Sequence, residues 1–93
     1  MNYITINPPL EAPVAAFSGA PTTGTAPLSV SFSDASTGTS PFTYAWTFGD
    51  SWTSTEQNPT HVYTDAVTYT VLLTVTGPGG SDDEIKTDYI TVS

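Results

Sequence analysis

Apolar side chains alternate with hydroxyl-bearing side chains along most of this 93-residue chain. The alternation is most regular in three segments, Leu28–Ser33, Thr43–Phe48 and Val67–Thr76. Because successive side chains point to opposite faces of a β-strand, a period of two predicts strands with one buried face and one face in solvent. The 18 threonines and 11 aromatic residues also favour strands, since they suit a pleated, half-buried surface. No segment keeps a helical period over three turns, so no helix is expected.

Four shorter segments also have the composition of strands. They are Val14–Ser18, Trp52–Thr55, Thr60–Tyr63 and Glu84–Val92. Connections that contain proline, glycine or asparagine separate the strands, and the longest connection is Gly19–Pro27. About seven short strands, spaced at roughly a dozen residues, predict an all-β fold in the form of an antiparallel β-sandwich.

The last two predicted strands should form an irregular hairpin. The segment Gly77–Gly80 has the sequence GPGG, which favours a tight connection between antiparallel neighbours. Within the last strand Ile85 occupies an odd position, whereas Ile90 and Val92 occupy even positions. One face of a regular strand cannot hold all three side chains, so we expect a bulge or bend near Thr87–Asp88.

The two ends of the chain resemble each other. Tyr3–Ile6 reads YITI and Tyr89–Val92 reads YITV, at an offset of 89 − 3 = 86 residues. A proline-rich stretch, residues 7–13, follows the first copy. The simplest interpretation is a tandem array, in which residues 1–11 are the end of a preceding repeat with its linker and residues 12–93 form the sandwich domain. The alternative is coincidence between two strands rich in threonine and isoleucine.

The charge of the chain excludes several classes of partner. Nine acidic residues and a single basic residue, Lys86, give a formal net charge of −8. Nucleic acids and anionic membranes both require basic patches, so neither is expected as a partner. No apolar run is long enough to insert into a membrane, and no signal peptide is expected after Met1. The absence of cysteine excludes disulfides, zinc–thiolate sites and cysteine nucleophiles.

The segment Ala45–Trp52, AWTFGDSW, contains residues that could be mistaken for an active site. Acid–base catalysis needs a partner for Asp50, and no second carboxylate lies close in sequence. The single histidine, His61, would need an activated serine to form a catalytic triad, and the G-x-S-x-G motif is absent. We therefore expect no catalytic residue. Asp50 should accept backbone N–H groups across a turn, and His61 should be packed and hydrogen-bonded.

Three consecutive acids, Asp82, Asp83 and Glu84, follow a glycine-rich turn. Calcium is bound by about six to eight oxygen atoms. Asp82, Asp83 and Asp50 are therefore calcium candidates, and Asp34 could add oxygens if the fold brings it near. The spacing fits no EF-hand loop. The alternative is a solvated run of charge that protects a strand edge from aggregation. No other cofactor is indicated.

The two tryptophans should have different roles. An immunoglobulin-type sandwich buries a tryptophan on its third strand, where Trp46 lies. Asp65–Val71 has the spacing of a tyrosine corner, in which the Tyr69 hydroxyl bonds back to the turn while its ring packs on Trp46. Trp52 follows Gly-Asp-Ser among polar residues, so it is the candidate for contact with a sugar or a neighbouring module. Alternatively, Trp52 caps the edge of the sandwich.

The same segments resemble a known family. From Ala12 to Ser93 the chain is similar to a PKD domain, the polycystic-kidney-disease repeat. The segments that carry the resemblance are Ala12–Phe17, Leu28–Phe32, Trp46–Asp50 (WTFGD), Ser54–Tyr63 (STEQNPTHVY) and Tyr69–Val75 (YTVLLTV). The family usually has W-D-F-G-D-G, so Thr47 and Ser51 depart from it, and the missing acid at position 47 weakens the calcium site that some members suggest. Glycine is also common in the family where Val67 stands.

The resemblance implies an Ig-like antiparallel β-sandwich from a bacterial or archaeal extracellular or cell-surface protein. Such modules often occur in tandem copies, in surface-layer proteins or beside secreted hydrolases, and have no catalytic activity. We therefore expect a monomeric spacer and adhesion module that contacts neighbouring repeats and a surface protein or polysaccharide. The alternative is a substrate-binding accessory module of a secreted protease or polysaccharide-degrading enzyme. The motif residues with expected structural roles are Trp46, Phe48, Gly49, Asp50, His61, Tyr63 and Tyr69.

Overall fold

The computed structural model describes residues 10–93, which form strands and turns but no helix. This range therefore contains no helix able to cross a membrane. The strands are β1 (Phe17–Ala20), β2 (Thr23–Gly24), β3 (Leu28–Asp34), β4 (Thr43–Thr47), β5 (Thr53–Ser54), β6 (Thr60–Tyr63), β7 (Thr68–Gly77) and β8 (Gly80–Val92). The strand expected at Tyr3–Ile6, as the end of a preceding repeat, lies outside the described residues.

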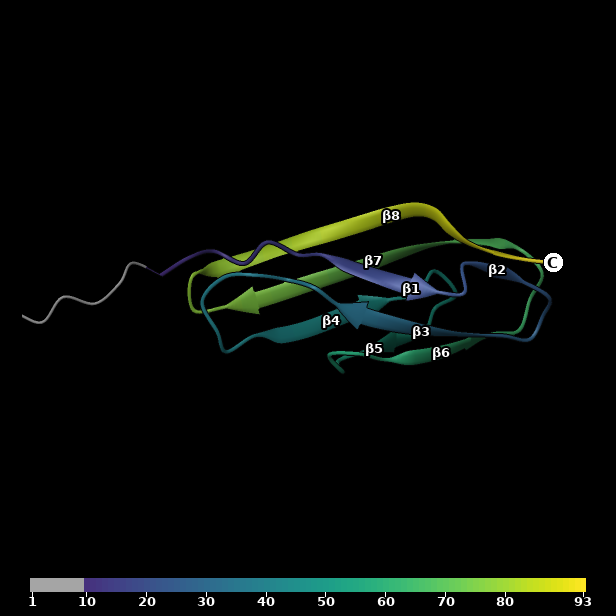
Figure 1. Ribbon diagram of the computed structural model, residues 1–93, viewed down its shortest axis with the longest axis horizontal. Helices are drawn as coiled ribbons and strands as arrows, with labels where there is room; N and C mark the ends of the chain where they lie inside the picture. Colours follow the sequence, from purple (N-terminus) through teal and green to yellow (C-terminus); the bar gives the residue numbers. More distant parts are fainter. Residues whose placement is uncertain (1–9) are drawn as a thin grey trace, which may run out of the picture.

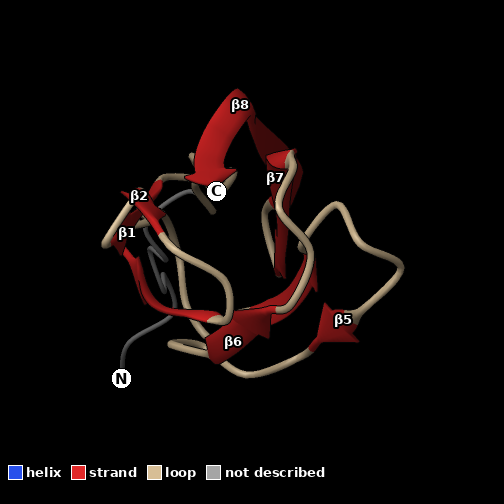
Figure 2. Ribbon diagram, turned by 90° about the vertical axis from the view of Figure 1, so that its right-hand side faces the viewer, coloured by secondary structure: helices blue, strands red, loops and turns tan. Residues whose placement is uncertain are grey.

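The strands form two sheets that enclose one core (Figure 1, Figure 2). One sheet has the order β1-β3-β6, and the other has the order β2-β8-β7-β4-β5. All paired strands are antiparallel except β2, which runs parallel to the end of β8. The predicted all-β, Ig-like sandwich is confirmed. The additional strand, β2, lies within the connection expected at Gly19–Pro27.

The alternation in the sequence separates core from solvent. On β3 every second residue from Leu28 to Phe32 is buried, and the intervening serines are exposed. On β7 every second residue from Tyr69 to Val75 is buried in the same way. Burial of these apolar side chains supplies the main driving force for the fold, at roughly 25 cal/mol for each Å² of apolar surface removed from water.

Trp46 on β4 lies at the centre of the core and has no exposed surface. Its ring centroid lies 5.0 Å from that of Phe17, 5.4 Å from that of Phe32 and 6.3 Å from that of Phe48. The indole Nε1–H donates to the carbonyl oxygen of Glu56 at 2.8 Å. The polar atom of this large side chain is thus satisfied, and its burial costs no lost hydrogen bond.

Three expectations about strand boundaries were wrong. The first strand begins at Phe17, and Val14 forms only an isolated bridge with Thr37. Val67 precedes β7 and is 51% exposed, so it does not belong to the buried face expected for it. The longest strand is β8, which begins at Gly80 instead of Glu84. The acids of this segment pair through their backbones with β7, and backbone pairing tolerates polar side chains at an accessible edge.

The bulge expected near Thr87–Asp88 is present. Tyr69 pairs with Ile90, but Val71 pairs with Lys86, so β8 contains two more residues than β7 between these pairs. Asp88 adopts a φ of 51° at this point, and its N–H donates to the Thr70 hydroxyl at 3.1 Å. An insertion of two residues keeps the alternation of the strand, so Lys86 and Ile90 face the same side and Ile90 is buried. Ile85 is 58% exposed on the other face, so the shared buried face from which the bulge was expected does not exist.

Candidate functional site

The sequence directs attention to the turn after β4, which runs from Phe48 to Trp52. Phe48 N–H donates to the Trp52 carbonyl at 3.2 Å and closes the turn. Gly49 has a φ of 89°, and a Cβ atom there would lie 2.6 Å from the Thr70 carbonyl oxygen of β7. Only glycine fits both the backbone conformation and this close approach. Ser51 also has a positive φ, at 77°.

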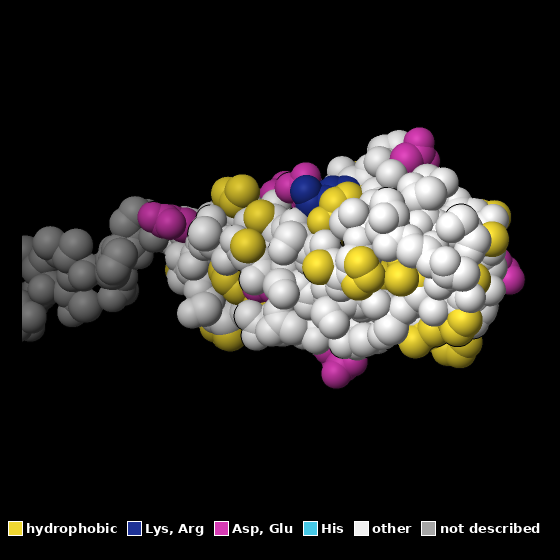
Figure 3. Space-filling view, turned by 45° about the vertical axis from the view of Figure 1, so that its right-hand side comes forward, with side chains coloured by type: hydrophobic (Ala, Val, Ile, Leu, Met, Phe, Trp, Pro, Cys, Tyr) yellow, Lys and Arg dark blue, Asp and Glu magenta, His cyan; other side chains and the backbone are white. Residues whose placement is uncertain are grey.

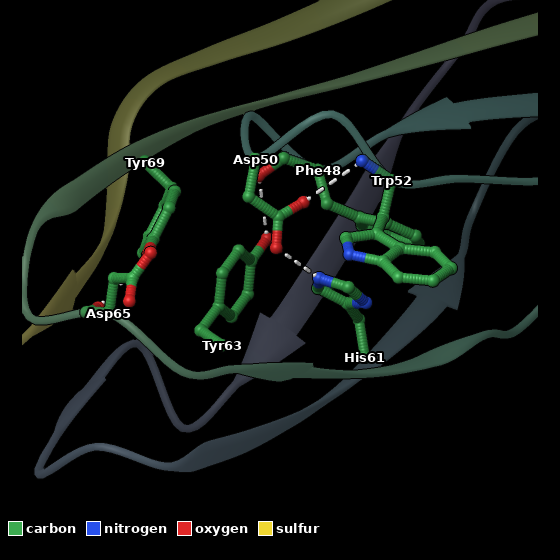
Figure 4. A network of polar contacts seen from close by, with 7 residues as sticks. All are labelled: Phe48, Asp50, Trp52, His61, Tyr63, Asp65 and Tyr69. Atoms are coloured by element: carbon green, nitrogen blue, oxygen red, sulfur yellow. Dashed lines mark hydrogen bonds and ion pairs between the residues drawn. The ribbon is translucent and has the colours of Figure 1, made fainter.

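Asp50 connects this turn to the opposite sheet (Figure 4). One carboxylate oxygen, Oδ1, accepts the Trp52 N–H at 3.2 Å, and the other, Oδ2, lies 2.6 Å from Nε2 of His61 on β6. Because an ionised carboxylate can only accept, Nε2 carries the proton and donates it to this bond. The relative exposures of the two side chains are 18% for Asp50 and 13% for His61. The pair therefore links the two sheets at one end of the sandwich.

Aromatic packing holds His61 in place. Its ring stacks on Phe48 with centroids 4.3 Å apart and an interplanar angle of 7°. The ring of Tyr63 meets it edge-on at 4.7 Å. The histidine is thus packed and hydrogen-bonded as a structural side chain. The sequence did not indicate its pairing with Asp50, because the two residues are eleven positions apart and belong to different sheets.

Two tyrosine hydroxyls complete the network. Tyr63 is fully buried and donates to the Phe48 carbonyl at 2.9 Å. Tyr69 donates to the Asp65 carbonyl at 2.9 Å, the hydrogen bond that the tyrosine-corner spacing predicts. The Tyr69 ring, however, lies 4.3 Å from Tyr63 instead of packing on Trp46 as expected. The reason is that Phe17, Phe32 and Phe48 surround Trp46.

The Tyr63 hydroxyl makes stability depend on alkaline pH. Burial, followed by the nearby charge of Asp50, raises the pKa of Tyr63 well above its ordinary value of about 10. The unfolded chain therefore loses this proton first as the pH rises, and the stabilisation present below about pH 10 is lost above it. We expect the free energy of unfolding to fall steeply between pH 10 and 12 in urea titrations. Tyr63→Phe should flatten that slope by up to about 1.4 kcal/mol per pH unit, whereas an unchanged slope would contradict this account.

The calcium candidates are not brought together. The Ala15 N–H donates to Oδ2 of Asp82 at 2.8 Å, and Asp83 pairs across the sheet with Thr74 on the neighbouring strand. Asp82 pairs with Val75, whereas the turn that holds Asp50 lies against Thr70, roughly 16 Å away along β7.

Asp34 is also occupied, since it accepts the Ser36 N–H at 3.0 Å and the Gln57 amide at 3.2 Å. Figure 3 shows acidic side chains dispersed over the visible face. Among residues 10–93, no three histidine or acidic side chains are grouped as a metal site requires.

Trp52 is the one large aromatic side chain of the turn that points into solvent. It is 67% exposed, whereas Trp46 six residues earlier is fully buried. Its backbone is fixed by the hydrogen bonds to Phe48 and Asp50, so the indole is presented from a closed turn. A rigid, exposed indole can stack on a sugar ring or anchor a protein partner at a low cost in conformational entropy.

Comparisons with known proteins extend over most of the chain. A family model described as the PKD domain matches residues 10–92. The crystal structure of the PKD1 domain from the Vibrio cholerae metalloprotease PrtV covers 88% of this chain and 98% of that chain, with 40% identity and a TM-score of 0.73. A structure described as carbohydrate-binding modules from the β-sandwich superfamily covers 92% of this chain and 36% of that chain, with 30% identity and a TM-score of 0.80.

A segment of 44 residues, 47% of this chain, is 54% identical to collagenase ColA of Bacillus cereus. The matched segment makes up only 5% of that collagenase.

Proposed function

Because this chain belongs to the PKD domain family, we propose that it is a non-catalytic, extracellular spacer and contact module of a longer exported protein. The exposed indole of Trp52 is the observation that carries the contact role. The other motif residues of this region are used to hold the two sheets together. Protein or carbohydrate chains are the partners we propose for Trp52, because both offer surfaces on which an indole packs.

The occupied side chains support a non-catalytic role. His61 and Asp50 bond to each other, and His61 packs against Phe48. Among residues 10–93, no serine, threonine or lysine side chain hydrogen-bonds to this pair as a nucleophile would. Residues 10–93 also enclose no pocket that would hold a small substrate. An enzyme needs a nucleophile or an acid–base pair next to a substrate cavity. These observations favour recognition through an open surface.

An accessory role beside a hydrolase is the second candidate. The matches to a collagenase and to a PKD domain of a metalloprotease favour it, as does the similarity to carbohydrate-binding modules. In this role the Trp52 surface would hold the polymer that the neighbouring catalytic domain cleaves. Both candidates use the same surface and differ in its ligand, so binding experiments separate them.

The test is co-sedimentation of the 93-residue chain with two insoluble materials, cell-envelope polysaccharide and collagen fibres. We expect saturable binding that Trp52→Ala weakens at least about tenfold, since a central aromatic contact contributes about 2 kcal/mol. Polysaccharide binding favours the surface module, and collagen binding favours the accessory role. Val62→Ala is the matched control, because Val62 is 47% exposed on the outer face of β6, opposite the His61 and Tyr63 side chains that contact the turn. Equal loss in both variants, or no binding to either material, would contradict the proposed contact.

A further inference from the structure

The segment that leads into the domain is fixed to it by backbone hydrogen bonds. Glu11 N–H donates to the Thr39 hydroxyl at 2.8 Å, and Thr39 N–H donates back to the Glu11 carbonyl at 3.2 Å. Three residues later, Val14 and Thr37 exchange hydrogen bonds of 2.8 and 3.1 Å. The chain is therefore held to the sandwich from Glu11 onward, six residues before β1 begins.

Glycines on two sides allow this close attachment. A Cβ atom on Gly79, in the hairpin between β7 and β8, would lie 2.3 Å from the Glu11 carbonyl oxygen. A Cβ atom on Gly38 would lie 2.9 Å from the Cα of Pro13, which is buried. Residues 11–13 thus lie between the turn at Gly38 and the turn at Gly79. We call this arrangement the N-terminal clamp. The direction in which the chain joins the domain is set by this clamp.

The other end of the chain is held equally firmly. Ser93 N–H donates to the Gly24 carbonyl at 2.8 Å, and the Ser93 carbonyl accepts the Ala26 N–H at 2.9 Å. Figure 1 shows this end and the N-terminal clamp at opposite ends of the long axis of the sandwich. Hydrogen bonds therefore hold the chain to the sandwich at both Glu11 and Ser93.

The sequence repeat then limits the distance between neighbouring copies. With an offset of 86 residues, Asn7 corresponds to Ser93, since 93 − 86 = 7. Only Pro8, Pro9 and Leu10 lie between that position and Glu11, where the clamp begins. Four Cα–Cα steps span at most about 14 Å, so the last held residue of one copy lies close to the first held residue of the next.

Each end also exposes apolar side chains. Val67 is 51% exposed, and its carbonyl accepts the Val92 N–H at 3.0 Å, which places it at the C-terminal end. At the opposite end, Leu10 is 60% exposed and Val14 is 59% exposed. Figure 3 shows apolar surface at both ends of the molecule. A short linker brings surfaces of this kind together, and burying them against each other is favourable.

We infer that consecutive copies of this module pack end to end in one orientation, with Val67 of one copy against Leu10 and Val14 of the next. The partner of each end surface is therefore a second copy of this chain. The inference rests on the spacer role proposed above and on the tandem array inferred from the resemblance of Tyr3–Ile6 to Tyr89–Val92. It adds that the array is stiff, because the clamp and the apolar contact leave the linker little freedom.

The test is a tandem chain of residues 1–93 followed directly by residues 8–93, with Ser81→Cys in both copies. The chain has no native cysteine, so the two exposed sites accept spin labels selectively. Pulsed electron paramagnetic resonance should give one narrow distance near 50 Å, since β8 spans about 40 Å and the linker about 10 Å. The distribution should be at least about threefold narrower than that of a chain with eight Gly/Ser residues inserted after the first Ser93.

Two variants test the named contacts. Val67→Asp in the first copy and Gly79→Ala in the second should each broaden the distribution towards that of the Gly/Ser chain. Pro78→Ala is the matched control for Gly79→Ala, because it adds no atom towards Glu11, and it should leave the distance unchanged. Circular dichroism checks that each variant folds.

A broad distribution in the parent tandem chain would overturn the end-to-end packing, as would a narrow one that neither variant changes. Binding through Trp52 is measured separately on the single chain. A failure of end-to-end packing can therefore be told apart from a failure of the proposed contact role of Trp52.

Discussion

Replacing Trp46 by alanine is expected to lower the free energy of unfolding by about 3–5 kcal/mol, the range for large-to-small changes of aromatic core residues. The side chain has no exposed surface and touches three other aromatic rings, so its removal leaves a cavity that the sheets cannot fill. It also removes the donor to the Glu56 carbonyl. A small domain is stable by about 5–15 kcal/mol, so the variant should be only marginally folded at room temperature.

Urea denaturation followed by far-ultraviolet circular dichroism measures this loss. Trp52→Ala is the matched control, because it removes the same side chain six residues away from an exposed position. Its effect should stay within about 0.5 kcal/mol. Similar losses in the two variants would show that the core is not organised around Trp46.

Replacing Gly49 by alanine is expected to cost about 2–4 kcal/mol, the second-largest effect. A side chain at a φ of 89° is strained in itself, and the new Cβ would lie 2.6 Å from a β7 carbonyl oxygen. That carbonyl belongs to the strand next to the bulge and cannot move without disturbing the sheet. The turn that presents Trp52 and holds Asp50 should therefore shift as well, and the Asp50–His61 bond should weaken.

Gly24→Ala is an informative control for this change. The added Cβ would also lie 2.6 Å from its nearest atom, but that atom is the end of the flexible Leu28 side chain. A flexible side chain can move aside, so we expect a loss of less than about 1.5 kcal/mol. Denaturation midpoints of the two variants give the comparison. If Gly24→Ala proved the more damaging change, the rigidity assigned to the turn at Gly49 would be wrong.

The fold follows from the sequence because the relevant signals are local. The period of two in β3 and β7 predicts which faces are buried. The bulge in β8 lies where the sequence predicts it, but the reason given for it was wrong, because Ile85 is exposed and does not share a face with Ile90. The start of β8 was not predicted, because Asp82–Glu84 resemble a solvated loop by composition. Their strand conformation is imposed by pairing with β7, which is a tertiary effect.

The site was predicted less completely because its contacts join distant parts of the chain. The Asp50–His61 pair and the bond from Ala15 to Asp82 depend on how the two sheets stack, which no local pattern specifies. At Ser51, by contrast, the structure explains a feature that is visible in the sequence. The family has glycine at this position, and the observed φ of 77° explains that preference, since the left-handed region favours glycine. The exposure of Trp52 is consistent with its polar neighbours in the sequence.

The most direct test of the proposed contact role is an amide NMR titration of the chain with cell-envelope polysaccharide, with and without calcium. We expect saturable shift changes confined to residues 50–55 around Trp52. Calcium should leave them unchanged, because Asp50 is bonded to His61 and Asp82 to Ala15. Shift changes elsewhere on the sandwich, or a spectrum unaffected at saturating polysaccharide, would contradict a contact site at Trp52.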